Sequence, residues 1–189
     1  MKKKIYLIYG WGGSPEEPMH KWIGEKAKEK DFDFIAPQMP NPEEPKISVG
    51  LNKIKEIVDN LDEQTIFIGH SVGCQAVLRY LETLENKKIG KIILIAPWMK
   101  LNEQTIEEEG EGVKEIAKPW METPIDFEKV KKICSKVICI FSNNDPYVPL
   151  SEENFFKEKL NAKTIILKNR GHFDSSSGIK SFPEILEFL

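Results

Sequence analysis

The chain has 189 residues, a length that suits one domain and leaves little room for a second. Its 27 basic and 30 acidic residues nearly cancel, and the net charge of −3 offers no basic surface for nucleic acid. Hydrophobic residues make up 40%, which argues against disorder, yet no apolar run approaches the roughly 20 residues of a membrane helix. We therefore expect a single domain over residues 1–189 that binds neither nucleic acid nor membranes, as a monomer or a weak homodimer.

The first third of the chain predicts two pairs of a strand and a helix. Lys4–Tyr9 and Phe32–Ala36 are short apolar runs of strand length, rich in β-branched and aromatic residues. Met19–Lys30 and Ser48–Leu61 place their apolar residues at intervals of three and four, which is typical of an amphipathic helix.

The middle of the chain repeats this order and then departs from it. Thr65–Gly69 reads as a strand, Val72–Leu84 as a helix and Lys91–Ala96 as the fourth strand. The connection that follows, Pro97–Ile125, is longer than the others but too short for a separate domain. We expect either a small lid or a decorated crossover helix there, with the acidic run Glu107–Glu111 as a solvated face.

The last third supplies two more strands and two more helical segments. Lys136–Phe141 and Lys163–Leu167 are the fifth and sixth strands. Ser151–Leu160 opens with a partial capping-box pattern, and Phe182–Leu189 closes the chain. Because strands and helices alternate throughout, the sequence predicts an α/β fold, a three-layer sandwich with a six-stranded parallel sheet and helices on both faces.

The sharpest motif is the segment Gly69–Gly73, which reads Gly-His-Ser-Val-Gly, the G-x-S-x-G pattern of a nucleophile elbow. It joins a predicted strand to a predicted helix, so a sharp turn would present the Ser71 hydroxyl at the carboxyl edge of the sheet. The helix N-terminus behind it favours developing negative charge. Ser71 is therefore the candidate nucleophile, and a purely structural turn is the alternative.

A serine hydroxyl is a weak nucleophile and needs a general base. The candidate is His172, because it follows the last predicted strand and so lies at the same sheet edge as Ser71. The other two histidines fit less well. His70 lies inside the elbow, where we expect its side chain to project elsewhere, and His20 lies at the start of the first helix.

The acid that orients the base is expected in a loop between the nucleophile and the base. Asp145 is the only carboxylate in the loop after the fifth strand, although an aspartate before a proline is also a common turn former. Asp174 competes with it but lies only two residues from His172. The order Ser71, Asp145, His172 is the one found in α/β-hydrolases.

An oxyanion hole requires two N–H donors. The backbone N–H of Val72 provides one, and the glycine-rich loop Gly10–Gly13 provides the second through Trp11 or Gly12. The same glycines could form a phosphate-binding turn, but Pro15 occupies the place of the third glycine and no P-loop lysine follows. Nucleotide binding is therefore the weaker interpretation, and we expect no cofactor.

These motifs together resemble the small α/β-hydrolase family of serine hydrolases that includes retinoblastoma-binding protein 9 and its bacterial relatives. The resemblance spans nearly the whole chain and implies an α/β-hydrolase fold with strand order 2-1-3-4-5-6 and little or no cap. It also implies the roles of nucleophile, acid and base for Ser71, Asp145 and His172. The matching segments are Gly10–Gly13, Gly69–Gly73, Ala96-Pro97-Trp98, Asn144–Pro149 and Gly171-His172-Phe173.

Side chains near the predicted strand ends could line an apolar acyl pocket. Trp98 is the best candidate because it closely follows the fourth strand, and Met99, Tyr147 and Phe173 are further candidates. Ordinary packing under loops is the alternative for each of them. No cluster of His, Cys or Asp has metal-ligand spacing, so we expect no metal.

The cysteines and the N-terminus favour the cytoplasm. Cys74, Cys134 and Cys139 form no C-x-x-C pattern and cannot all pair, which suits reduced thiols. The basic residues 2–4 precede an apolar run, Ile5–Tyr9, that is too short for a signal peptide.

The sequence thus predicts a serine hydrolase that cleaves a small carboxylic ester, or an amide, through an acyl-enzyme intermediate. The short chain leaves no room for a large cap domain, so we expect an open site for small acyl substrates. Two alternatives stay open: a noncatalytic ligand- or protein-binding member of the same fold, and acyl transfer to an acceptor other than water.

Overall fold

The computed structural model describes residues 3–189, so Met1 and Lys2 of the basic N-terminal run lie outside it. In this part of the chain six strands form one sheet in the order β2-β1-β3-β4-β5-β6, and every neighbouring pair is parallel. The predicted fold class and strand order are confirmed. The strands are β1 (Lys4–Ile8), β2 (Asp33–Ile35), β3 (Thr65–His70), β4 (Lys91–Ile95), β5 (Val137–Ser142) and β6 (Lys163–Leu167).

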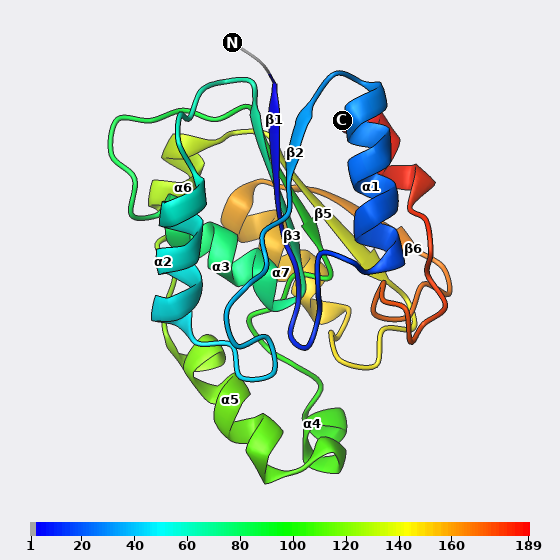
Figure 1. The fold of residues 1–189 in the computed structure, drawn as a ribbon. Coiled ribbons are helices and arrows are strands. Elements are labelled where there is room, and N and C mark those ends of the chain that lie inside the picture. Colours follow the sequence, from blue (N-terminus) through cyan, green and yellow to red (C-terminus); the bar gives the residue numbers. More distant parts are fainter. Residues whose placement is uncertain (1–2) are drawn as a thin grey trace.

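Helices cover both faces of this sheet, as Figure 1 shows. One face carries the first helix, α1, and the C-terminal 3₁₀ turn, η1, while the opposite face carries four helices that pack side by side, α2, α3, α6 and α7. The elements are α1 (Pro18–Glu29), α2 (Ile47–Ile57), α3 (Val72–Leu81), α4 (Glu103–Glu109), α5 (Glu111–Glu122), α6 (Phe127–Ile133), α7 (Ser151–Leu160) and η1 (Pro183–Glu187).

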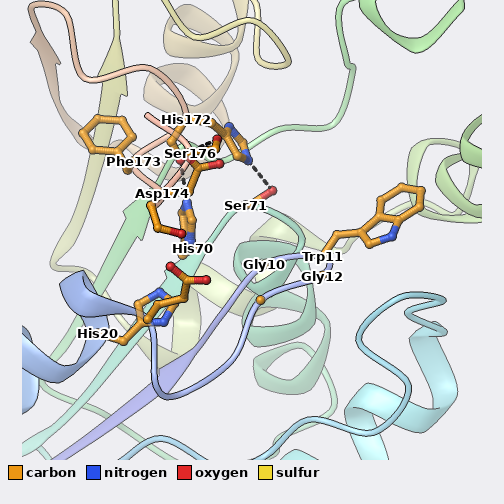
Figure 2. Close-up of a pocket in the computed structure, with 13 residues that line it drawn as sticks. Gly10, Trp11, Gly12, His20, His70, Ser71, His172, Phe173, Asp174 and Ser176 are labelled. Carbon is orange, nitrogen blue, oxygen red and sulfur yellow. Dashed lines mark hydrogen bonds between the residues drawn. The ribbon is translucent and has the colours of Figure 1, made fainter. Parts of the chain in front are cut away.

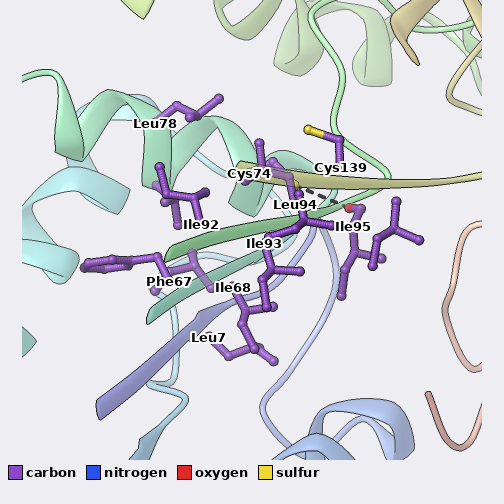
Figure 3. Close-up of a cluster of buried hydrophobic side chains, with 14 of the residues drawn as sticks. Leu7, Phe67, Ile68, Cys74, Leu78, Ile92, Ile93, Leu94, Ile95 and Cys139 are labelled. Carbon is purple, nitrogen blue, oxygen red and sulfur yellow. Dashed lines mark hydrogen bonds between the residues drawn. The ribbon is translucent and has the colours of Figure 1, made fainter. Parts of the chain in front are cut away.

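The core lies on both sides of the central strands. Every residue of β3 and of β5 is buried, which is why these strands read as continuous apolar runs in the sequence. Figure 3 shows the side chains of β3 and β4 packed against Leu78 of α3 and Cys139 of β5. Each fully buried leucine or isoleucine contributes about 1.5–3 kcal/mol. This packing fixes the ends of β3, β5 and β6, where the motifs lie.

Two sequence predictions about elements need correction, and one helix was not predicted. Phe182–Leu189 does not form an α-helix, because only Pro183–Glu187 turns, as a 3₁₀ helix that begins at a proline. α6 was not predicted; it begins after Asp126, whose side chain accepts a hydrogen bond from the Lys129 N–H at 3.0 Å. Ser151 is the first residue of α7 rather than its cap, and no side chain caps that helix.

The long connection 97–125 folds into the helical hairpin of α4 and α5, which extends beyond the carboxyl ends of the strands (Figure 1). Buried Arg79 of α3 holds its far end, because the guanidinium donates to the carbonyls of Trp120 at 3.1 Å and Thr123 at 2.6 Å. The same guanidinium donates to Gln75, whose amide donates to the Trp98 carbonyl. The hairpin is thereby attached to the core at both of its ends.

Within residues 3–189, every helix is too short or too polar to cross a bilayer.

Candidate active site

The elbow after β3 holds Ser71 in a backbone conformation that L-residues rarely adopt, with φ 53° and ψ −127°. Two glycines make this turn possible. A Cβ on Gly69 would lie 2.6 Å from the Cα of Cys74, and one on Gly73 would lie 2.1 Å from the carbonyl oxygen of Ile8. The turn therefore depends on the close contacts of α3 with β3 and with β1 that these glycines permit.

His172 and Asp145 come together at the Ser71 hydroxyl. His172 Nε2 lies 2.8 Å from Ser71 Oγ, and its Nδ1 lies 2.9 Å from Asp145 Oδ2 and 3.1 Å from Oδ1. Figure 2 shows the contact between His172 and Ser71 as a dashed line. Asp145 is buried, with its side chain 1% exposed, and its Oδ1 also accepts the backbone N–H groups of Tyr147 and Val148. A carboxylate cannot donate, so the Nδ1 proton faces Asp145 and the Nε2 lone pair faces the serine.

The loops that carry the acid and the base are joined by hydrogen bonds. Asn144 Oδ1 accepts the Gly171 N–H at 2.9 Å and the Ser142 hydroxyl at 2.8 Å. Ser142 Oγ accepts the Arg170 N–H at 3.0 Å. These contacts fix the relative positions of Asp145 and His172, although their sequence positions differ by 27 residues. No sequence pattern marks Ser142 and Asn144 as part of the site, because the sequence shows only that they precede Asp145 at the end of a strand.

His70 does not project away from the catalytic residues, contrary to the sequence expectation. Its Nε2 lies 2.8 Å from the His172 carbonyl oxygen, and the two imidazole rings are 5.3 Å apart. The His172 N–H donates to Ser177 Oγ, so the backbone of the base is held on both sides. Asp174, the rejected competitor for the acid, instead accepts the Ser177 N–H and the Ser176 hydroxyl, both at 2.8 Å.

The loop after β1 passes directly beside Ser71. A Cβ on Gly10 would lie 2.9 Å from the Ser71 Cβ, so only glycine permits this approach. The predicted donor Gly12 is excluded in this conformation, because its N–H already donates to the Pro42 carbonyl at 2.8 Å. Trp11 and Val72 are the remaining predicted oxyanion donors, and Val72 begins α3, where N–H groups lack intrahelical partners.

A mainly apolar cavity of about 240 Å³ opens beside Ser71, between the strand ends and the helical hairpin. Trp98 and Tyr147 line it, as the sequence suggested. Met99 does not, and its backbone N–H donates to Glu152 of α7. Phe173 lines a second, smaller cavity beside Ser71 instead, and its buried ring packs against Phe182. The hairpin and its approach supply the rest of the apolar wall, namely Leu101, Ile106 and Val113.

Over residues 3–189, no group of three or more His, Cys, Asp or Glu side chains is arranged to hold a metal ion.

The chain is similar to known proteins over nearly its whole length. YdeN of Bacillus subtilis (strain 168) is 27% identical over 192 residues, which cover 100% of this chain and 95% of YdeN. The crystal structure of the B. subtilis ydeN gene product matches with a TM-score of 0.88 at 24% identity, over 98% of this chain and 96% of that chain. Serine hydrolase RBBP9 of Rattus norvegicus is 30% identical over 178 residues, 92% of this chain and 88% of that protein.

A more distant structure shares the fold alone. Est1E of Butyrivibrio proteoclasticus, solved with ferulic acid bound, matches with a TM-score of 0.68 at 16% identity, over 98% of this chain and 84% of that chain. The family model described as serine hydrolase, in contrast, matches this sequence over residues 5–189, almost from end to end. The chain therefore belongs to the serine hydrolase family.

Proposed function

We propose that this hydrolase cleaves small carboxylic esters, with Ser71 as nucleophile, His172 as general base and Asp145 as the acid that orients it. The observation that carries the proposal is the unbroken series of contacts from Asp145 through His172 to Ser71 Oγ at 2.8 Å. That separation is within the range required for proton transfer from the hydroxyl. A noncatalytic binding role would not require this alignment.

In the first half of the reaction, Ser71 Oγ attacks the ester carbonyl carbon while His172 Nε2 takes the hydroxyl proton. The carbonyl oxygen becomes an oxyanion, which the backbone N–H groups of Val72 and Trp11 stabilise. The intermediate then collapses, the bond to the alkoxy oxygen breaks, and His172 returns its proton to the leaving alcohol. The acyl group remains attached to Ser71 as an ester.

In the second half, a water molecule attacks the acyl carbonyl and His172 accepts one of its protons. The bond to Ser71 Oγ breaks, and the proton passes to the serine as the carboxylic acid leaves. Asp145 stays deprotonated throughout and stabilises the imidazolium that forms in each half of the reaction.

The helical hairpin contributes to the choice of substrate because it lines the cavity beside Ser71. Its apolar side chains Ile106 and Val113 form one wall of the cavity of about 240 Å³, which we propose holds the acyl chain. The size of this cavity supports a preference for short acyl groups. We propose that segment 97–125 acts as a fixed wall of a single domain rather than as a separate cap.

The experiment is a panel of p-nitrophenyl esters from acetate to octanoate, assayed with the wild-type protein and with Ser71→Ala. We expect turnover of the short esters and a loss of at least about 10³-fold in kcat for the variant. Asp145→Asn should lose about 10⁴-fold, because the amide favours the wrong imidazole tautomer. Equal turnover by wild-type protein and Ser71→Ala would refute the proposal, provided that circular dichroism shows both to be folded.

We also propose that the protein works in the cytoplasm as a monomer or weak homodimer. Its three cysteines are buried free thiols, which suits a reducing compartment. Light scattering at micromolar concentration tests the oligomeric state.

A further inference from the structure

A second cavity, of about 130 Å³, also adjoins Ser71, and the buried His20 and His70 line it. Figure 2 shows polar side chains from three separate parts of the chain converging on it. They come from α1 and the turn before it, from the end of β3, and from the loop after His172. These side chains are Glu17, His20, His70, Asp174 and Ser176.

The hydrogen bonds of His20 make its free nitrogen an acceptor. The side chain is 2% exposed, and Nδ1 lies 2.8 Å from the Ser14 carbonyl oxygen. Because a carbonyl only accepts, Nδ1 carries the proton. Burial lowers the pKa of His20, so the ring is neutral and Nε2 presents a lone pair. This buried Nε2 has no hydrogen-bond partner.

His70 repeats the same arrangement from the opposite wall. Its side chain is 5% exposed, and its Nε2 proton faces the His172 carbonyl oxygen at 2.8 Å. Burial, with the neighbouring His172 and His20 as smaller causes, lowers the pKa of His70 to about 3. Its Nδ1 is therefore a second buried acceptor, and it too lacks a partner.

Two carboxylates complete the set of acceptors. Glu17 Oε2 is buried without a partner. Burial alone would raise the pKa of Asp174, but the hydrogen bonds from Ser177 and Ser176 and the nearby His172 outweigh it, and the pKa is lowered. Among the described residues no lysine or arginine lines this cavity, and the Ser176 hydroxyl already donates to Asp174.

The side chains of Glu17, His20, His70 and Asp174 offer this cavity hydrogen-bond acceptors and no positive charge. An acceptor that stays unpaired when buried costs about 1–3 kcal/mol, and a buried carboxylate costs more unless a cation pairs with it. A primary ammonium group supplies three donors and one positive charge in a volume that fits about 130 Å³.

We propose that this cavity is the binding subsite for a protonated primary amine of the substrate. The inference rests on the proposed function, and it specifies the substrate class as esters that carry an ammonium group a few bonds from the scissile carbonyl. Glu17 supplies the countercharge, and His20 and His70 accept the ammonium protons.

The test compares two p-nitrophenyl esters of equal length, the 3-aminopropanoate and the butanoate, which differ by an ammonium in place of a methyl group. Each kcat/KM is divided by the rate of hydrolysis in buffer, which removes the intrinsic effect of the charge. We expect the wild-type protein to prefer the amine ester at least about tenfold, and Glu17→Gln to lose most of this preference. The matched control is Glu16→Gln, an exposed neighbour paired with Lys21, which should keep the wild-type ratio.

Two failures are distinguishable. If neither ester is hydrolysed, the proposed function is wrong and the subsite proposal falls with it. If the butanoate is cleaved but the amine ester is not preferred, or Glu17→Gln keeps the preference, only the subsite proposal is overturned.

A second measurement uses only the wild-type protein, in case Glu17→Gln does not fold. Propylammonium chloride should inhibit butanoate hydrolysis competitively, whereas 1-propanol at the same concentration should not. Equal inhibition by both, or by neither, would overturn the proposal.

Discussion

The reactivity that we propose for Ser71 depends on its neighbours rather than on its own chemistry. The hydroxyl faces His172 Nε2, and the base in turn is fixed through its ring by Asp145 and through its backbone by His70 and Ser177. Each of these contacts restricts the imidazole without touching the substrate. Such restriction keeps the reacting atoms aligned before a substrate arrives.

The buried histidines predict how stability depends on pH. His70 titrates at about 3 in the folded protein and near 6.5 in the unfolded chain, because burial disfavours the charged ring. Between these values the unfolded chain binds more protons, so the free energy of unfolding falls as the pH drops below 6.5. His70→Gln removes this contribution but retains an amide that can donate to the His172 carbonyl.

We therefore expect the wild-type protein to lose stability more steeply than His70→Gln between pH 6.5 and pH 4. The difference in slope should be up to about 1.4 kcal/mol per pH unit. Urea denaturation at each pH measures it. Parallel curves for the two proteins would contradict the assignment of a neutral, buried His70.

Among the individual residues of the site, the sequence predicted mainly those that follow the ends of strands. Ser71, Asp145 and His172 each follow a strand of the parallel sheet, so the topology alone brings them to one edge. The hydrogen bond from His70 to the His172 carbonyl joins residues 102 positions apart. Sequence spacing does not show a contact between residues so far apart in the chain. The cavity beside Ser71 that His20 and His70 line could not be predicted for the same reason.

Among the elements, the elbow between β3 and α3 carries the strictest steric requirement. Gly73 lies in the first turn of α3, where it faces the carbonyl of Ile8 in β1. The helix and the strand can approach this closely only because glycine has no side chain. The geometry of the nucleophile thus depends on the packing of two elements that are adjacent in space and distant in sequence.

Replacing Gly73 by alanine should destabilise the protein by about 3 kcal/mol or more, since its Cβ would lie 2.1 Å from a backbone oxygen. Gly112→Ala in α5 is the matched control, because nothing lies within 4 Å of the added Cβ. That change should raise stability by about 0.5–1 kcal/mol, from helix propensity. Thermal unfolding measures the Tm of each variant. A similar Tm for both would contradict the steric explanation.

The sequence predicted four of the eight helical segments and missed or misassigned the other four for identifiable reasons. α6 has only seven residues, too few for helical periodicity to stand out, although Asp126 was an available cap signal. α4 and α5 lay inside a segment predicted only as a lid or crossover helix. The C-terminal segment has helical spacing, but it forms a 3₁₀ turn of five residues.

At the scale of the whole molecule, two cavities of different polarity flank the nucleophile. The α4–α5 hairpin forms one wall of the mainly apolar cavity. It stands where larger hydrolases of this fold carry a cap domain. Arg79 fixes the hairpin to the core, so its position depends on a buried hydrogen-bond network. We therefore propose that the size of the apolar cavity limits the length of the acyl chain.

Filling that cavity should shift the preference toward shorter esters. Val113→Trp places a large ring where α5 lines the cavity, and we expect the ratio of kcat/KM for hexanoate over acetate to fall about tenfold. Lys118→Trp, on the exposed side of α5, is the control and should leave the ratio unchanged. An unchanged ratio for Val113→Trp would show that the acyl chain binds elsewhere.

The central claim is that Ser71 is an activated nucleophile. The most direct measurement is treatment of the folded protein with a fluorophosphonate, followed by intact mass and peptide mapping. We expect one phosphonyl group per chain on Ser71, none on Ser71→Ala, and none on urea-unfolded protein. Absence of label on Ser71 in the folded wild-type protein, or labelling that persists in Ser71→Ala, would contradict this claim.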